Sequence, residues 1–343
     1  MFVRLKQSVQ IVTIFTISLL CVFATSLSAD EPLPSWKDVA ARAKIIAYVE
    51  SVTDANSDRF IPPSQRVAVF DNDGTLWCEA PLPIQLAYIF HSIKQKAEKE
   101  PELKKDPAVA ALLKGDYKTV FSGGLKELLR LTAMSHVGLT TDEFKASVLE
   151  WIETARHPQL NYRFKDTVYK PMIEVINYLQ ANGFKTFIVS GGGSDFMRAW
   201  SEEVYNIPPE QVVGSNIVTK FELRGDEAVL VKTMDDLFVN DKEGKPIGIH
   251  QFIGRRPVMC FGNSDGDQAM LEYTTMGNPL PSLGVIVHHT DADREYAYDK
   301  KPPSSGKLIT ALEVAPERGW IVVDMKNDWK EVFDPAKALN KDK

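Results

Sequence analysis

Four short runs of apolar residues stand out along the chain, and each ends in polar residues or glycine. They span Val67 to Phe70, Thr186 to Val189, Val258 to Phe261 and Val285 to Val287. Runs of this length, bounded in this way, are typical of strands buried on both faces in a parallel sheet. The pattern therefore predicts four strands of a central sheet.

Helical patterns lie between these runs, and the clearest covers Pro171 to Asn182. Proline stands in its first turn, Gly183 follows its end, and one face is apolar, formed by Met172, Val175, Ile176 and Leu179. Strands that alternate with helices indicate an α/β fold, a doubly wound, Rossmann-like parallel sheet. We assign residues 30–76 and 166–343 to this core.

The first two runs are separated by more than a hundred residues, which is too long for a simple crossover. Helical patterns occur there at Ile84 to Lys96, Gly124 to Ala133 and Thr141 to Ala155. We therefore expect residues 77–165 to form an inserted helical cap domain. A smaller, strand-rich insertion is predicted at about 212–239, around the turn Arg224-Gly225-Asp226.

Residues 1–29 differ from the rest of the chain. Arg4 and Lys6 precede an apolar run that ends in a small-residue stretch, which predicts a secretory signal peptide and a periplasmic or secreted protein. An uncleaved membrane anchor is the alternative, because the run is nearly long enough to span a bilayer and Leu27 is a poor residue three before a cleavage site. Lipidation at Cys21 is disfavoured by the bulky Leu20 before it.

Composition narrows the functional classes. The chain has 44% hydrophobic and 25% charged residues, as expected for a globular protein, and a formal charge of −6. Without the first 29 residues, 38 basic side chains face the same 46 acidic ones, so the charge becomes −8. No basic stripe is present, which argues against a nucleic-acid partner. Cys78 and Cys260 are too few for a disulfide framework, and Cys260 is predicted to be buried in its strand.

Polar residues follow the first three runs at the point where ligands bind in doubly wound sheets. These segments are Asp71-Asn72-Asp73-Gly74-Thr75, Ser190-Gly191-Gly192-Gly193 and Gly262-Asn263-Ser264-Asp265-Gly266-Asp267. Because the carboxyl ends of parallel strands meet at one edge, we expect the three segments to form one pocket.

Asp71 and Asp73 point to phosphate-ester chemistry. Two close carboxylates repel each other, and Mg2+, which prefers oxygen ligands and often binds beside substrate phosphate, relieves that repulsion. One carboxylate can attack phosphorus, and the second can protonate the leaving group and later deprotonate water. A calcium loop is excluded, because its register would place Val69 and Ala80 where carboxylates are required. A plain turn remains the alternative.

The other segments supply matching groups. Ser190 and the glycines precede a helix predicted to begin near Ser194 or Asp195, so their hydroxyl and N–H groups suit an anion. Asn263 and its neighbouring aspartates suit a metal, although an acidic surface turn is the alternative. Lys245 begins a segment leading to the third strand, where its ammonium would offset the negative charges.

His288 and His289 would face opposite sides of a strand, so we interpret them as strand-end residues. We interpret Trp320 and Trp329 as packing residues.

Taken together, these motifs resemble the haloacid dehalogenase superfamily of hydrolases, and within it the phosphoserine phosphatase-like phosphatases. The resemblance spans roughly residues 66–290. It implies that Asp71 is the nucleophile, that Asp73 is the acid/base, and that Ser190 and Lys245 hold the phosphoryl oxygens. It also implies Mg2+ bound by Asp71, the Asp73 carbonyl and Asn263, with Asp267 holding a ligand water. Gly191, Gly192, Thr75 and Glu79 are expected to bind substrate.

Two departures from the family pattern limit what the resemblance implies. Asn263 stands where the family usually has aspartate, so the identity of the metal is open. The family's phosphoserine-binding glutamate would fall at Ala80, whereas Glu79 lies one earlier, so phosphoserine specificity is not supported. Cap residues such as Glu79, Trp77 and Arg130 are expected to choose the substrate, a small phosphorylated metabolite such as a phosphorylcholine-like or phosphoamino compound.

Two alternatives to the phosphatase remain, and a third class is excluded. A catalytically degenerate phosphate-ester binding protein is supported only by Asn263. A dehalogenase is the least favoured hydrolase, because that chemistry dispenses with the metal and usually lacks a carboxylate at the position of Asp73. A transport ATPase would need many membrane-spanning helices, which the sequence does not show.

Overall fold

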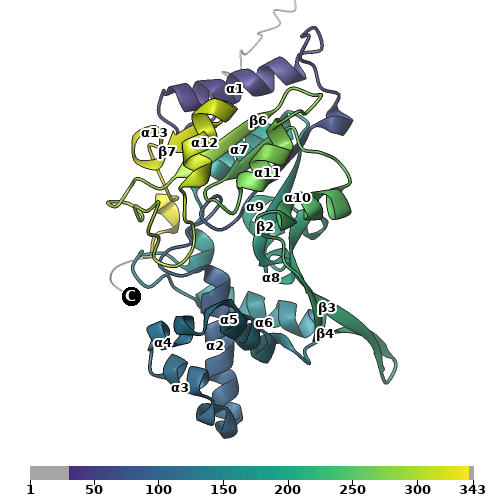
Figure 1. The fold of residues 1–343 in the computed structure, drawn as a ribbon, viewed down its shortest axis with the longest axis vertical. Helices are drawn as coiled ribbons and strands as arrows, with labels where there is room; N and C mark the ends of the chain where they lie inside the picture. Colours follow the sequence, from purple (N-terminus) through teal and green to yellow (C-terminus); the bar gives the residue numbers. More distant parts are fainter. Residues whose placement is uncertain (1–30, 340–343) are drawn as a thin grey trace, which may run out of the picture. The chain divides into compact units, whose positions relative to one another are not determined.

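A seven-stranded sheet forms the centre of the protein in the computed structural model, which describes residues 31–339 (Figure 1). The strand order is β4-β3-β2-β1-β5-β6-β7. The neighbouring strands are parallel except for the antiparallel pair β3 and β4. The predicted signal segment, residues 1–29, lies outside the described residues.

The four predicted strands are all present. They are β1 (Val67–Phe70), β2 (Lys185–Gly193), β5 (Met259–Gly262) and β6 (Leu283–His288). The sheet is completed by β3 (Val212–Arg224), β4 (Glu227–Phe238) and β7 (Ile321–Asp324). All four residues of β1 are buried, and its two neighbours are β2 and β5. The predicted α/β doubly wound fold is therefore confirmed.

Helices pack against this sheet as its α/β pattern requires. The predicted helix at Pro171 is α7 (Lys170–Ala181), and its four predicted core residues are buried. The other helices outside the segment between β1 and α7 are α1 (Ala40–Thr53), α8 (Ser194–Arg198), α9 (Ser201–Tyr205), α10 (Gly244–Gly248), α11 (Gln268–Thr275), α12 (Thr310–Arg318) and α13 (Met325–Asp328). None of the helices in residues 31–339 has both the length and the apolar character needed to cross a membrane.

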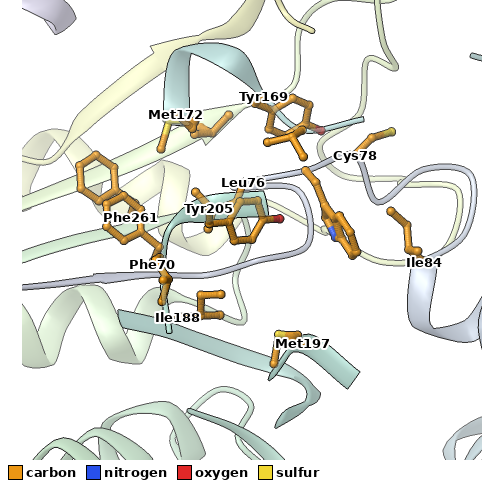
Figure 2. Packing of buried hydrophobic residues seen from close by; sticks show 14 of the residues in the cluster. Phe70, Leu76, Cys78, Ile84, Tyr169, Met172, Ile188, Met197, Tyr205 and Phe261 are labelled. Carbon is orange, nitrogen blue, oxygen red and sulfur yellow. The ribbon is translucent and has the colours of Figure 1, made fainter. Parts of the chain in front are cut away.

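Two stacked phenylalanine rings lie in the core. The rings of Phe70 on β1 and Phe261 on β5 stack with their centroids 4.4 Å apart. Figure 2 shows this pair beside Ile188 of β2 and Met172 of α7. Cys260 is buried, as predicted, and is a free thiol, as is Cys78. Trp320 and Trp329 are also buried, in agreement with their interpretation as packing residues.

Five helices lie between β1 and α7, where the sequence predicted an insertion. They are α2 (Ile84–Lys99), α3 (Pro107–Leu113), α4 (Tyr117–Ser122), α5 (Gly124–His136) and α6 (Thr141–Thr154). Figure 1 shows them as a group apart from the sheet. The boundaries of the cap at residues 77 and 165 stay a prediction, since the chain from Pro32 onward forms one compact unit.

The predicted strand-rich insertion is a long hairpin made of β3 and β4, which turns at Gly225 with a φ of 63°. Its first residues belong to the central sheet, because Val212 and Val213 pair with β2. Its other strand contacts the cap. The Gly138 N–H donates to the Lys232 carbonyl (3.1 Å), and the Lys232 N–H donates to the Leu139 carbonyl (2.9 Å). The hairpin thus links the sheet to the cap helices.

We predict that Phe261→Ala lowers the free energy of unfolding by about 3 kcal/mol or more, because it leaves a cavity beside a buried aromatic ring. Urea denaturation measures this loss. Phe221→Ala on the hairpin is the matched control: this ring is 62% exposed, so we expect a loss below about 0.5 kcal/mol. Equal losses in the two variants would contradict the packing described for the core.

Candidate active site

The three polar segments meet at one edge of the sheet, as predicted. β1 lies between β2 and β5, so the residues at the carboxyl ends of these strands and directly after them are neighbours. They border a cavity of about 720 Å3. The predicted site residues that line it are Asp71, Asp73, Glu79, Ser190, Gly191, Gly192 and Lys245. The structure therefore brings these residues together around one cavity, while their assignment as site residues and the role of each stay predictions.

Lys245 lies between two carboxylates at the base of the cavity. Its Nζ is 2.6 Å from Asp71 Oδ1 and 2.6 Å from Asp267 Oδ1, and it also donates to the Val189 carbonyl (3.0 Å). The Lys245 side chain is only 2% exposed. Burial alone would lower the pKa of Lys245, but the charges of Asp267 and Asp71 outweigh this effect and raise it. The ammonium therefore stays charged beside Asp71.

Asp71 is a carboxylate in a strongly desolvated position. Burial raises the pKa of Asp71 well above its usual range, and the nearby charge of Asp267 adds to this effect, whereas Lys245 opposes it. Asp71 is fixed by its backbone as well, since its N–H donates to the Phe261 carbonyl of β5 (2.9 Å). A buried carboxylate with one ammonium partner is suited to nucleophilic attack.

Asp73 is held by the side chain of Trp77. Trp77 Nε1 donates to Asp73 Oδ1 (2.9 Å), and the Trp77 ring stacks on Trp200 with centroids 4.2 Å apart. Burial raises the pKa of Asp73, although the Trp77 hydrogen bond lowers it in part. An aspartate with a raised pKa can hold a proton nearer neutral pH, as a general acid must. Trp77 is fully buried, so it supports Asp73 and does not line the cavity.

The predicted glycine loop is the last part of β2, which carries Ser190 to the cavity and runs to Gly193, and α8 begins at Ser194, as predicted. Two of its N–H groups already have partners within the protein. The Gly192 N–H donates to Ser190 Oγ (3.0 Å), and the Gly193 N–H donates to Gln85 Oε1 of α2 (2.7 Å). Gln85 also lines the cavity and was missed in the sequence, because nothing in an amphipathic helix distinguishes it from a surface glutamine.

Asn263 and Thr75 are buried behind Gly74 and do not line the cavity. The Thr75 hydroxyl donates to Asn263 Oδ1 (3.1 Å), and Asn263 Nδ2 donates to Glu79 Oε1 (2.8 Å). Gly74 has a φ of 79°, and a Cβ there would lie 2.1 Å from Asn263 Nδ2, so only glycine fits.

Glu79 is bound by protein groups on both oxygens. Besides Asn263, the Tyr298 hydroxyl donates to its Oε1 (2.8 Å) and the Ser305 hydroxyl to its Oε2. Burial raises the pKa of Glu79 to about 7, although the hydrogen bonds from these two hydroxyl groups act to lower it. Asn263 stands at the position where the family pattern has aspartate. In this chain a carboxylate, that of Glu79, lies beside it.

His289 contacts the first motif and was not anticipated. Its Nε2 is 2.8 Å from the Gly74 carbonyl oxygen and its Nδ1 is 3.1 Å from Glu295 Oε2. Both contacts require an N–H donor, so the ring carries two protons. Burial opposes the charge, but the Glu295 hydrogen bond prevails and raises the pKa of His289. No sequence signal could reveal this, because Gly74 lies far earlier in the chain.

The oxygen donors expected to bind Mg2+ are of the chemical type that this ion prefers. The Asp71 carboxylate, the Asp73 carbonyl and Asn263 Oδ1 are hard oxygen donors, and an amide oxygen keeps a second lone pair after accepting from Thr75. Asp267 shapes the same loop, because its Oδ2 accepts from the N–H groups of Asn263 and Ser264. Within residues 31–339, no group of three or more His, Cys, Asp or Glu side chains is arranged as a metal site.

Arg130 does not line this cavity. Its guanidinium pairs with Asp106 (2.8 Å) and Glu127 on the cap. Of the three cap residues expected to choose the substrate, only Glu79 therefore lines the cavity.

Comparison with known proteins places the chain in a family. The model for haloacid dehalogenase-like hydrolases matches residues 68–272, more than half of the chain. The chain therefore belongs to the haloacid dehalogenase-like hydrolase family, as the motifs indicated. Comparison with curated protein sequences finds no match.

Solved structures with a similar fold include a functionally unknown protein from Anaerococcus prevotii, with 16% identity and a TM-score of 0.50 over 73% of this chain and 85% of that one. A protein of unknown function from Bordetella pertussis has 16% identity and a TM-score of 0.49 over 76% and 99%. A phosphoserine phosphohydrolase-like protein from Francisella tularensis has 18% identity and a TM-score of 0.36 over 65% and 87%. At 16% identity the likeness to the Anaerococcus prevotii protein concerns the fold alone.

We predict that Lys245→Met lowers the free energy of unfolding by about 3 kcal/mol or more, because it leaves two buried carboxylates without their cation. The measurement is chemical denaturation in the presence of EDTA. Adding Asp267→Asn to this variant removes one of the two charges and should restore part of the loss. A Lys245→Met chain as stable as the original would show that the ammonium does not compensate these carboxylates.

Proposed function

We propose that the chain is an Mg2+-dependent phosphomonoester hydrolase that acts through an aspartyl-phosphate on Asp71. The observation that carries the proposal is the buried Asp71 carboxylate, paired with Lys245 at 2.6 Å and followed by the acid/base candidate Asp73. Membership of a hydrolase family supports the same chemistry. The substrate we propose is a small phosphorylated metabolite.

In the first step, a carboxylate oxygen of Asp71 attacks phosphorus and the bond from phosphorus to the ester oxygen breaks. Asp73 gives its proton to the departing oxygen, so an alcohol leaves. Ser190 holds a phosphoryl oxygen, and the nearby charge of the Lys245 ammonium offsets the negative charge that shifts onto these oxygens. Bound Mg2+ would supply further positive charge at these oxygens.

In the second step, water attacks phosphorus and gives a proton to Asp73. The bond from Asp71 to phosphorus breaks, which releases inorganic phosphate and regenerates the Asp71 carboxylate. Trp77 keeps Asp73 in place through both steps, since its Nε1 holds one oxygen of the carboxylate.

Two other functions remain as competitors. A phosphate-ester binding protein without turnover would use the same pocket, and Asn263 is its support. A dehalogenase is the weaker alternative, since this chain keeps Asp73 two residues after Asp71. We further propose export to the periplasm or medium, supported by the pattern of residues 1–29, where the enzyme would release phosphate from esters.

We predict that the purified protein hydrolyses p-nitrophenyl phosphate with added Mg2+ and that EDTA suppresses the activity. Asp71→Asn should lower kcat at least about a thousandfold, because the nucleophile is lost. Circular dichroism checks that this variant keeps its fold. Equal rates in both proteins would refute the assignment of Asp71, and no hydrolysis of any phosphomonoester would favour the binding protein.

A second prediction concerns Asn263. Asn263→Asp alone would set a carboxylate against Glu79 in a buried place, so we expect it to lose about 1–3 kcal/mol of stability without Mg2+. Asn263→Asp with Glu79→Gln should recover this loss and bind Mg2+ more tightly than the original chain. Thermal unfolding with and without MgCl2 measures both effects. If Asn263→Asp alone were as stable as the original chain, the presence of Glu79 would not explain why residue 263 is an amide.

A further inference from the structure

The cavity is larger than a phosphate group requires. Its volume of about 720 Å3 falls in the range of sites that enclose drug-sized ligands. Much of its wall is apolar and comes from the cap helices, α8 and the hairpin: Leu86, Ile89, Leu128, Phe144, Phe196 and Leu237. The space beyond the phosphate is therefore suited to an apolar body.

One polar atom in this wall has no partner. His136, the last residue of α5, lines the cavity and is 2% exposed. Its Nε2 is buried and makes no hydrogen bond to any group in residues 31–339. Buried polar atoms are nearly always paired with protein or water. An unpaired one in a cavity wall therefore points to a contact made by a ligand.

The neighbours of His136 determine what Nε2 can bind. The Ser135 hydroxyl donates to the Thr132 carbonyl (2.7 Å), and it lies 2.5 Å from His136 Nδ1. A hydroxyl has a single hydrogen, so His136 Nδ1 is the donor in the second contact. Burial lowers the pKa of His136 to about 3, and the charge of Lys232 acts in the same direction, so the ring is neutral. Nε2 is thus a free acceptor, and it needs a donor from the ligand.

Lys232 and Asp195 stand in the same wall. Lys232 on β4 is 2% exposed, and its Nζ donates to the Asp195 carboxylate. This Nζ and the His136 ring both lie 4.5 Å from the centroid of the Phe144 ring. Because the charges of Lys232 and Asp195 compensate each other, a charged ligand group would lose its hydration there without gaining a counter-ion.

We propose that His136 and Lys232 form a subsite for an uncharged hydroxyl on an apolar leaving group of the substrate. This inference rests on the proposed phosphatase function and specifies its substrate class. A hydroxyl can donate to His136 Nε2 and accept from Lys232 Nζ, whereas an alkyl group can do neither. A phosphoamino acid does not match, because its leaving group carries an ammonium and a carboxylate.

The test uses matched pairs of aryl phosphates: 4-alkylphenyl phosphates of graded chain length and the same compounds with a terminal hydroxyl. Isothermal titration calorimetry with the Asp71→Asn chain and Mg2+ gives Kd without turnover. At the length that reaches His136, we expect the hydroxyl compound to bind about tenfold more tightly than its alkyl partner. His136→Phe keeps a ring but removes the acceptor, so this ratio should fall to about one.

A matched control is His91→Phe, which changes an exposed histidine of α2 outside this cavity and should keep the ratio. A second measurement needs no change at His136. In the Asp71→Asn chain labelled with 15N-histidine, the unprotonated Nε2 signal of His136 should shift when the hydroxyl compound binds and stay in place with the alkyl partner. Absence of that shift would overturn the proposal even if His136→Phe failed to fold.

The outcomes separate the two proposals. Equal affinity within every pair, or a preference that survives His136→Phe, overturns the subsite while leaving phosphatase activity untouched. Conversely, the original chain could fail to hydrolyse every probe while the Asp71→Asn chain shows a preference that depends on His136. In that case the phosphatase proposal fails and the hydroxyl subsite stands.

Discussion

A single buried ammonium holds the site together. Lys245 contacts the carboxylates of Asp71 and Asp267, which come from the ends of two neighbouring strands, β1 and β5. Taking three charges out of water is costly, and this arrangement persists only because each charge has a close opposite partner. The loop of Asp267 in turn carries Asn263, and Asn263 contacts Glu79. The position of the first motif therefore depends on the position of one lysine.

A second layer of buried polar contacts fixes the backbone of the first motif. Glu79 joins Asn263 to Tyr298 and Ser305, while His289 holds the Gly74 carbonyl. The segment between β6 and α12 thereby supports a loop from the start of the fold. Fully paired polar networks of this kind restrict a site to one geometry, which a covalent displacement at phosphorus requires.

The sequence predicted the architecture well where local patterns are strong. β1, α7 and the three clearest cap helices follow from apolar periodicity, and the site follows from the rule that polar segments gather at strand ends. β7 was missed, because it is a four-residue strand whose burial alternates. The start of the hairpin was taken for an insertion, although Val212 pairs with the central sheet. The contact of His289 joins residues far apart in the chain, and the free acceptor of His136 depends on the tautomer of its ring. Neither feature leaves a local pattern in the sequence.

The hydrogen bonds between the hairpin and the cap have a consequence for how such proteins diversify. Gly138 and Leu139 pair with Lys232, and Lys232 itself lines the cavity that the cap encloses. The two insertions therefore behave as one module, although the second strand of the core separates them in the chain. Exchanging the cap alone for that of a relative would leave the edge of β4 without its hydrogen-bond partners and Lys232 without the cap residues around it. Recombination toward new substrates therefore has to transfer the cap and the hairpin together.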